Sequence, residues 1–480
     1  MNLNVSRTAA FTLVLLLSAC AMGPDYERPE VPVPEEYRST DIPGASIANL
    51  KWWELFEDED MTTLIETALL NNKELAIAVA RIEEARALLG FTRADQFPNL
   101  DGTAGAARGN TIPGVNVPGA IDNTFVLAAN LTYEIDLWGK LRRSTEAARA
   151  ELLATVEARN VVTITLVADV ASLYLLLLDL DDRVDIAQRT VVTRQQSLDI
   201  IQARFDRGTV PLIDVNQAQI ELADAEAASA ALQRELQQAE NLLSVLMGQN
   251  PGPIVRTPGG EERLFTIDIP AGLPSELLER RPDVRQASQQ LAAQTARIGV
   301  AEALRFPSLG LTGSLGLASN DLDDFLSGDN KVWGLSANLF GPILDAGRNK
   351  ARVEAEIART EQALKNYELT VLRAFQEVDD SLVDIQTFRA EARARERQMI
   401  AARSATTLSR ARYDGGVTSY LEVLESERSL FSAELLSSST QREQLVSVVT
   451  LYKALGGGWL TEEEAAAAAQ TQAEATAQRQ

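Results

Sequence analysis

The spacing of hydrophobic positions changes along the chain, and each change predicts a different kind of element. Between residues 60 and 96 the apolar positions recur at helical spacing, and Phe97-Pro98 then ends the helix. These positions are Leu64, Ile65, Ala68, Leu69, Leu75, Ala76 and Val79. In residues 124–137 apolar side chains alternate with small or polar ones, which predicts a strand with two different faces.

Four stretches show this alternation, and they predict strands at about 100–109, 123–137, 308–318 and 331–341. One apolar and one polar face suits a membrane barrel, with lipid outside and water inside. It suits equally a soluble antiparallel sheet whose apolar face covers a core. Trp138, Trp333 and Phe340 lie near strand ends, where they fit an aromatic girdle or core packing. The strand pattern alone leaves both interpretations open.

Two very long helical hairpins follow the predicted strands. No proline or glycine interrupts the chain from Lys140 to Phe205, so one helix would extend for about 100 Å. Residues 206–211 then turn the chain, and a return helix runs to about Met247. The second hairpin repeats this between Arg348 and about residue 455. Because such helices have only narrow apolar seams, they must pack side by side.

The chain is an internal duplication with an offset of 208 residues. The sequence Ala203-Arg204-Phe205-Asp206-Arg207-Gly208 returns as Ala411-Arg412-Tyr413-Asp414-Gly415-Gly416. The same register relates Gly139 to Gly347 and Gly248 to Gly456. Two units supply four strands, which are too few to close a barrel, since known membrane barrels use eight or more. Closure would require oligomerisation, with eight strands in a dimer or twelve in a trimer.

The amino terminus predicts a processed and lipidated protein. Arg7 and the apolar run Ala9–Leu17, which is too short to span a bilayer, indicate a signal peptide over residues 1–19. The sequence Leu17-Ser18-Ala19-Cys20 resembles the lipobox of bacterial lipoproteins, which implies acylation of Cys20. The alternatives are an ordinary signal peptide or a buried thiol. By the same resemblance, Ala21 in place of Asp favours the outer membrane.

No later segment offers 18 uninterrupted apolar residues for a spanning helix, the nearest being Val170–Leu178 between two aspartates. A membrane crossing would therefore use β-strands.

The amino-acid composition excludes most kinds of catalytic site and argues against nucleic acid as a partner. Asp and Glu number 68 against 45 Lys and Arg, and the formal net charge of −23 argues against nucleic-acid binding. Histidine is absent, which excludes Ser-His-Asp and Cys-His nucleophiles and imidazole metal sites. One cysteine gives no intrachain disulfide or thiolate cluster. A lipase or protease would need a Ser-Lys or paired-carboxylate site, and none stands out. We expect no enzyme, cofactor or metal site.

Several motifs together resemble the outer-membrane efflux proteins of the TolC superfamily, in the lipoprotein branch typified by OprM. They are Gly23-Pro24-Asp25-Tyr26-Glu27-Arg28-Pro29, Trp52-Trp53 with Phe56, Leu273-Pro274-Ser275-Glu276-Leu277-Leu278-Glu279-Arg280-Arg281-Pro282-Asp283-Val284-Arg285, Arg305-Phe306-Pro307-Ser308-Leu309 and the turns at Gly208 and Gly416. The resemblance implies an α+β fold, with long helical hairpins forming a periplasmic helical barrel. It further implies a homotrimer, whose four strands per chain make a twelve-stranded outer-membrane barrel.

The resemblance also implies a function, namely the exit duct of a tripartite efflux pump in a Gram-negative bacterium. The partners would be a periplasmic adaptor and an inner-membrane transporter, often of the RND type, and the cargo would be small molecules. Two alternatives stay open. One is the exit duct of a type I protein secretion system, and the other is a periplasmic lipoprotein scaffold without a pore.

The expected organisation has five parts. A signal peptide (1–19) precedes a lipid-anchored tether and the start of the equatorial region (20–58). The first efflux repeat (59–265) and the second (266–460) follow, and a low-complexity tail (461–480) ends the chain. The proline-rich stretch Pro24–Pro34 predicts an extended tether. The Arg280-Arg281-Pro282-Asp283 motif predicts ordinary helix-start chemistry.

The resemblance assigns a gate to the helix after the second turn. Leu421 would form an apolar constriction and Glu425 an acidic ring, with Tyr413 and Arg428 holding the tip shut. Glu425 stands where an Asp is common in the family. The alternative is a solvated carboxylate at Glu425 paired with Arg428 three residues on.

The turns would dock the adaptor's helical hairpins. They comprise Arg207, Gly208 and Thr209 in the first hairpin and Gly415, Gly416 and Val417 in the second. Their alternative is simple turn chemistry, in which glycine supplies the backbone angles of a tight reversal.

Overall fold

The computed structural model describes residues 21–34, 37, 53, 56, 58–109, 111–112, 115–116, 122–257 and 274–457. The predicted signal peptide, Cys20, Trp52, Leu273 and the tail 461–480 lie outside the described residues.

The chain folds into two compact units, each assembled from separate stretches of sequence. The first comprises Met1–Glu30, Ala80–Val156 and Gln286–Leu369, and the second comprises Val31–Val79, Glu157–Arg285 and Thr370–Gln480. Each unit takes parts from both repeats, so the compact units cut across the duplication that the sequence displays. The long helices α4 (Lys140–Asp206) and α8 (Arg348–Asp414) contribute to both.

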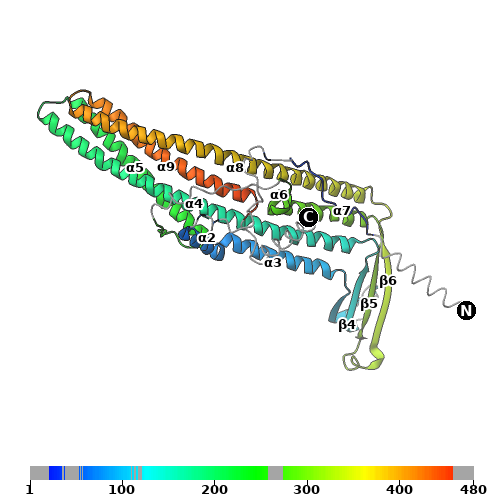
Figure 1. Ribbon diagram of the computed structural model, residues 1–480. Coiled ribbons are helices and arrows are strands. Elements are labelled where there is room, and N and C mark those ends of the chain that lie inside the picture. The colour runs from blue at the N-terminus through cyan, green and yellow to red at the C-terminus, as the bar shows by residue number, and fades with distance from the viewer. Residues whose placement is uncertain are drawn as a thin grey trace. The chain divides into compact units, whose positions relative to one another are not determined.

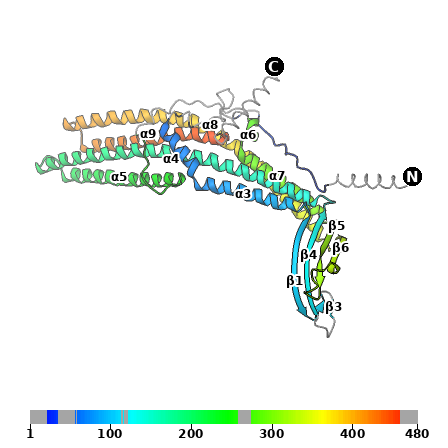
Figure 2. The same ribbon diagram turned by 90° about the horizontal axis from the view of Figure 1, so that it is seen from below.

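The first unit contains one four-stranded antiparallel sheet of order β1-β4-β5-β6 (Figure 2). The strands are β1 (Asn99–Gly109), β4 (Asp122–Ile135), β5 (Ser308–Ser319) and β6 (Lys331–Phe340). Each lies within two residues of its predicted position. Two short strands, β2 (Thr111–Ile112) and β3 (Val115–Asn116), pair with each other. The sheet joins the two repeats because β4 pairs with β5.

The two faces of this sheet differ as the alternation predicts. On the polar face Thr312 and Ser336 share a hydrogen bond of 2.6 Å, and Asn130 donates to Thr103 at 2.9 Å. On the apolar face large side chains are exposed, with Leu315 at 65% and Trp333 at 79%. β1 and β6 are exposed along nearly their whole length. Within the described protomer, therefore, the sheet does not cover a soluble core.

One aromatic residue expected near a strand end is packed rather than exposed. Trp138 stacks on Phe306 with ring centroids 4.6 Å apart, and its indole N–H donates to Pro307 O at 2.8 Å. Trp333 and Phe340 stay exposed.

The second unit is helical, and its long helices return on themselves as two hairpins (Figure 1). They are α4 (Lys140–Asp206) with α5 (Leu212–Leu246), and α8 (Arg348–Asp414) with α9 (Tyr420–Ala454). At each tip a glycine with φ +70° follows the helix, at Gly208 and at Gly416. Thr209 N–H donates to Arg204 O at 3.0 Å, which is the six-residue bond of a Schellman cap. The positions of Gly208 and Gly416 thus determine where α4 and α8 end, and so the length of each hairpin.

The predicted helix over residues 60–96 is two helices in the structure, which corrects the sequence interpretation. α2 (Glu59–Asn71) and α3 (Lys73–Ala94) meet at Asn72, whose ψ of 131° is not helical. The Asn72 side chain accepts from Leu75 N–H at 2.9 Å and donates to Leu246 O at 2.8 Å. An asparagine that caps one helix end and binds another helix terminus breaks the run without proline or glycine.

A buried arginine starts the remaining helix pair, α6 (Pro274–Arg280) and α7 (Pro282–Ala303). Arg281 bonds Asp283 at 2.6 Å and donates to Ala454 O at 2.9 Å, where α9 ends. A guanidinium at a helix carboxyl end satisfies an unpaired carbonyl and complements the dipole. Pro282 and Asp283 begin α7, as the motif predicts, and Arg281 adds a contact to the end of α9 that the sequence did not indicate.

Among the described residues, α4 alone is long and apolar enough to cross a membrane by length and composition. Most of its apolar stretch is buried inside the fold, as in the core helix of a soluble domain.

Candidate gate at the helical tips

The tips of the two hairpins share one apolar cluster in the second unit. Its buried members come from α4, α5 and α9, with four partly buried side chains packed against them. They are Ile201, Val215, Ala218, Tyr420, Val423 and Leu424, with Leu198, Phe205, Val210 and Tyr413 around them. Burial of this cluster holds the two turns next to each other, so any movement of one tip must break contacts with the other.

Tyr413 lies at the centre of the contact between the tips. Its ring is 5.4 Å from that of Tyr420, and the Arg204 guanidinium lies 4.9 Å from its centroid. Arg204 also pairs with Asp414 at 2.9 Å, which joins α4 to the second turn. The Tyr413 hydroxyl is buried without a hydrogen-bond partner among the described residues. Tyr413 thus contributes to the contact between the tips through its ring.

Leu421 and Glu425 lie one helical turn apart on the exposed face of α9. Leu421 is 57% exposed, and Glu425 is exposed as well. Val423 and Leu424, which lie between them in sequence, are buried in the cluster. Helical periodicity therefore places Leu421 and Glu425 on the opposite, exposed face of α9. Glu425 makes no hydrogen bond or ion pair among the described residues. Leu421 and Glu425 therefore form an exposed surface against which a symmetry-related copy of α9 could pack.

Arg428 is fixed by a different partner from the one expected. Its Nε donates to Glu221 Oε1 of α5 at 2.5 Å, rather than turning to Glu425. Glu221 is 3% exposed and also pairs with Arg194 of α4, with 3.2 Å between Nη2 and Oε2. The Glu221 carboxylate raises the pKa of the Arg428 guanidinium through this hydrogen bond. One carboxylate therefore ties α9 to both helices of the first hairpin.

Glu221 and Arg194 are absent from the sequence prediction. The buried stripe of α5 runs Val215, Ala218, Glu221, Ala225, Ser229 and Leu232. A carboxylate within an apolar stripe at helical spacing is a detectable signal, because a buried charge needs a partner. The partner itself could not be found, since nothing in the sequence distinguishes Arg194 from the other arginines of α4.

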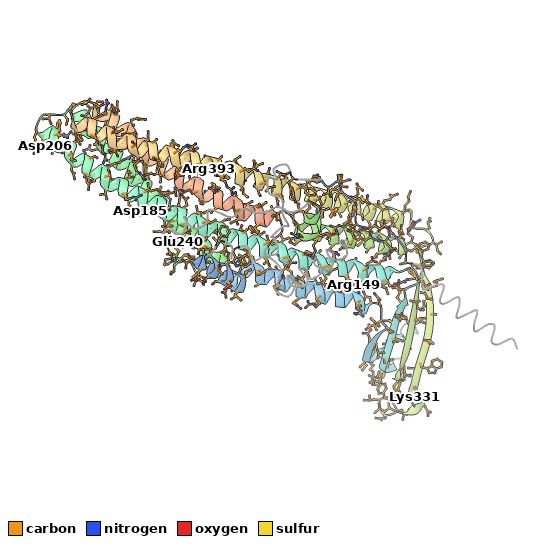
Figure 3. All side chains as sticks on the ribbon, viewed as in Figure 1. Arg149, Asp185, Asp206, Glu240, Lys331 and Arg393 are labelled. Atoms are coloured by element: carbon orange, nitrogen blue, oxygen red, sulfur yellow. The ribbon has the colours of Figure 1, made fainter. Side chains whose placement is uncertain are left out.

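The predicted docking residues all lie at the two turns. Arg207, Gly208, Thr209, Gly415, Gly416 and Val417 are all exposed. Asp206, just before the first turn, marks this end of the hairpin in Figure 3. Thr209 Oγ1 donates to Arg204 O at 2.8 Å, so part of the turn chemistry is local.

Three features of this chain are typical of an outer-membrane channel protomer. They are the duplicated long helical hairpins, a four-stranded sheet with both faces accessible, and an exposed leucine and carboxylate at the tip. The sequence model of the family "Outer membrane efflux protein" matches residues 64–249 and 273–457. The chain belongs to this family, within the OprM-like lipoprotein branch of the TolC-type channels, and has the TolC-like fold. It is an outer-membrane efflux channel, a family for which no catalytic activity is implied.

Similar proteins export different substances. The chain is 34% identical over 458 residues to the cation efflux system protein CusC of Escherichia coli (strain K12), covering 93% of this chain and 98% of CusC. It is 35% identical over 460 residues to the outer membrane protein OprJ of Pseudomonas aeruginosa, covering 94% and 95%. It is 34% identical over 462 residues to the solvent efflux pump protein SrpC of Pseudomonas putida, covering 93% and 97%. A crystal structure of CusC superposes with a TM-score of 0.80 at 33% identity, covering 92% of this chain and 100% of that one.

Proposed function

We propose that this efflux channel is the homotrimeric exit duct of a tripartite pump. The sheet supports closure by other copies, because β1 and β6 each have an edge unpaired within this four-stranded sheet, and the trimer follows from the family resemblance. Three copies that pair β6 with the next β1 would give a closed barrel of twelve strands, which removes every free edge. The partners are a periplasmic adaptor at the exposed turns and an inner-membrane transporter of the RND type.

The gate is formed by Leu421 and Glu425, three copies of each converging on the trimer axis. The observation that carries this proposal is their placement: both are exposed and unpartnered on one face of α9, while Arg428 is held in place by Glu221. Three carboxylates in a narrow ring attract cations, repel anions and raise one another's pKa. Tyr413 packs against Tyr420 on the buried side of α9 and so holds the two tips together.

The cargo is proposed as small molecules. Relatives named for cation and solvent efflux are equally similar to this chain, at 34% identity each. Such even similarity is expected when the duct conducts whatever its pump delivers, and selection resides in the inner-membrane partner.

Cys20 is the proposed attachment point of the lipid that anchors the mature chain to the outer membrane. Intact mass of the purified protein tests this directly. We expect a chain that begins at Cys20 and carries acyl groups, whereas a chain that begins elsewhere or lacks the added mass contradicts lipidation.

The gate is tested by conductance of the purified protein in a planar bilayer under a salt gradient. We expect the wild type to give a small, cation-selective conductance. Glu425→Gln removes the ring charge at almost constant volume, so the reversal potential should move toward zero. Leu421→Ala widens the apolar constriction and should raise conductance without moving the reversal potential.

Two control variants accompany these measurements. Glu361→Gln removes an exposed carboxylate of α8, and Ser432→Ala changes an exposed residue of α9 beyond the tip. Neither should alter conductance or selectivity. An unchanged reversal potential in Glu425→Gln would refute the acidic ring. Silence of the Leu421→Ala, Glu425→Ala double variant would refute the position of the gate.

A further inference from the structure

The segment that follows Cys20, predicted from its prolines to be an extended tether, is bound along the first unit. Ala21–Arg28 is extended, and Met22 N–H donates to Trp138 O at 3.0 Å, at the junction between β4 and α4. This is a main-chain bond across more than a hundred residues of sequence. It places the amino end of the segment beside the last residues before α4.

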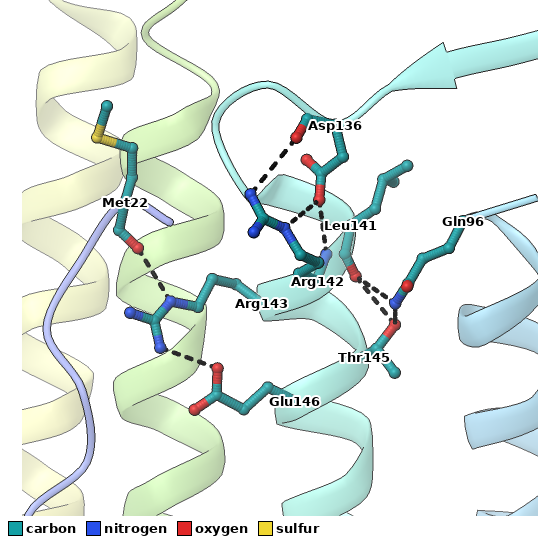
Figure 4. A network of polar contacts seen from close by, with 8 residues as sticks. All are labelled: Met22, Gln96, Asp136, Leu141, Arg142, Arg143, Thr145 and Glu146. Atoms are coloured by element: carbon teal, nitrogen blue, oxygen red, sulfur yellow. Dashed lines mark hydrogen bonds and ion pairs between the residues drawn. The ribbon is translucent and has the colours of Figure 1, made fainter. Parts of the chain in front are cut away.

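Arg143 of α4 is the main side chain that holds the segment. Its Nε donates to Met22 O at 3.0 Å, and its Nη2 donates to Gly23 O at 3.1 Å and to Asp25 Oδ1 at 2.7 Å. Nη1 pairs with Glu146 at 2.9 Å on the same helix. Figure 4 shows the guanidinium between the Met22 carbonyl and the Glu146 carboxylate. The Arg143 side chain is only 6% exposed.

Removing the segment would leave Glu146 as the one remaining acceptor of Arg143 among those described. Three of its four acceptors come from residues 22–25. Hydrogen bonds to a charged donor are stronger than neutral ones, so these three contacts favour the bound segment. Arg143 is therefore a preformed receptor for two carbonyls and a carboxylate in an extended chain.

Glycines make the close approach possible. A Cβ on Gly299 of α7 would lie 2.4 Å from Met22 O, and a Cβ on Gly139 would lie 2.9 Å from Ala21 Cα. On the segment itself Gly23 has φ +86°, and a Cβ there would lie 2.5 Å from Gly299 Cα. Only glycine fits at all three positions, on both the segment and the helices.

The far end of the segment is fixed to two other helices of the same unit. Tyr26 shares a 2.8 Å hydrogen bond with Ser288 of α7, and Arg28 Nε donates to Tyr367 of α8 at 3.4 Å. Tyr367 is fully buried. The segment thus contacts α4, α7 and α8 in turn.

We propose that Gly139, Arg143 and Gly299 form a binding site for this chain's own amino-terminal segment, residues 21–28, and that its occupation holds Ala21 beside the β4–α4 junction. Because consecutive Cα atoms are about 3.8 Å apart, holding Ala21 limits how far the preceding residue can lie from the junction. For the acyl chains proposed at Cys20, a bound segment would therefore keep the attachment point near the sheet. The binding site itself does not depend on lipidation or on the gate.

Release of the segment can be measured by limited proteolysis of the full mature protein in detergent. A glutamate-specific endoprotease cuts after Glu27, an exposed residue that must leave the surface to enter a protease cleft. A synthetic peptide covering residues 21–34 gives the cleavage rate of the free segment. We expect the wild type to be cut far more slowly than this peptide.

Two variants disrupt the contact between the segment and α4, one on each partner. Arg143→Ala removes the receptor, and Gly23→Ala obstructs the segment while leaving every helix unchanged. Each should accelerate cleavage by at least about tenfold, which corresponds to about 1.4 kcal/mol. Arg149→Ala, an exposed arginine of the same helix (Figure 3), and Gly90→Ala, whose added Cβ meets nothing within 4 Å, should leave the rate unchanged.

Two results would overturn the proposal. One is cleavage of the wild type at the rate of the free peptide, and the other is an unchanged rate in Gly23→Ala. Hydrogen exchange of α7 in the Arg143→Ala protein separates segment release from unfolding of the helix, and we expect α7 to stay protected. Absence of acyl groups at Cys20 would refute lipidation but would not alter these cleavage rates.

Discussion

The two helical hairpins have the same backbone plan and very different side-chain surroundings. α4 and α8 are both 67 residues long, and α5 and α9 are both 35. The glycines that end the long helices have the same φ of +70°, and those after the return helices have +69° and +73°. The duplication therefore preserved the positions that end helices, because a shift there would change the reach of one hairpin relative to the other.

The two long helices differ in how many of their large apolar side chains are buried, although their backbones match. α4 has three large apolar side chains that are exposed: Leu153, Val192 and Ile200. α8 has six: Ile357, Leu369, Leu372, Val383, Ile400 and Leu408. Within one chain α4 acts as a core helix, whereas α8 presents apolar surface that its own protomer leaves uncovered. A helix of a symmetric assembly would have such a surface where a second copy packs against it.

The polar contacts between the paired helices differ as well. In the second hairpin Arg410 pairs with Glu427 at 2.7 Å and Arg403 with Glu434 at 2.9 Å. At the positions of Arg410 and Glu427 the first hairpin has Gln202 and Gln219. Its helices are joined instead by the buried pair of Arg194 and Glu221. The first hairpin relies on one buried network, and the second on several pairs that are partly exposed.

The largest effect is expected from breaking that buried network. Glu221→Ala would leave Arg194 buried without its carboxylate, and removal of one partner of a buried pair costs about 3–5 kcal/mol. Hydrogen exchange of α4 and α5 around the pair measures the loss, which should be confined to the first hairpin and to the neighbouring part of α9. Glu226→Ala, an exposed position of α5, is the matched control. A change below about 1 kcal/mol in Glu221→Ala would contradict a dependence on this network.

A smaller effect is expected from giving the second hairpin the residues of the first. Arg410→Gln alone leaves the Glu427 carboxylate, which is 8% exposed, without its partner and should cost about 1–2 kcal/mol. Adding Glu427→Gln should recover part of that loss, because two amides can bond to each other. A double-mutant cycle on thermal stability gives the coupling. If the double variant equals the sum of the two single variants, the pair makes no contribution of its own.

The smallest effect is expected at the turns, where the hairpins are alike. Gly208→Ala and Gly416→Ala each place a Cβ at a positive φ, which costs about 1 kcal/mol, and neither added atom meets a neighbour. Both should destabilise by the same amount in hydrogen exchange of the adjacent amides. Gly90→Ala, inside a helix, should have the opposite sign. Unequal losses at the two turns would show that the tips are not equivalent.

Local features of the fold could be predicted from the sequence, whereas contacts between distant segments could not. The strands and long hairpins follow from alternation, from the absence of proline and glycine within the helices, and from the glycines at their ends. The break at Asn72 was missed because asparagine is tolerated in helices, and its role depends on the Leu246 carbonyl far along the chain. Within the candidate gate, Leu421 and Glu425 could be assigned by family resemblance, and their role stays a prediction.

The binding of the amino-terminal segment shows the same limit. Its prolines correctly indicate an extended chain, but extension says nothing about whether the chain is bound. Arg143 looks like any other arginine of a polar helix start, and Gly299 like a chance glycine in α7. Their combined meaning appears only when the fold brings α4, α7 and residues 21–25 together.

The free edges of the sheet also bear on the life of a single protomer before assembly. β1 contains three glycines and three alanines among its eleven residues, a composition with little tendency to form strands by itself. An exposed edge of strongly strand-forming residues would recruit any passing extended chain and aggregate in the periplasm. With a weak edge strand, the sheet gains most of its stability from its neighbours. In the proposed trimer, folding of this sheet would therefore depend on the local concentration of other copies, and the weak edge would limit pairing with unrelated chains.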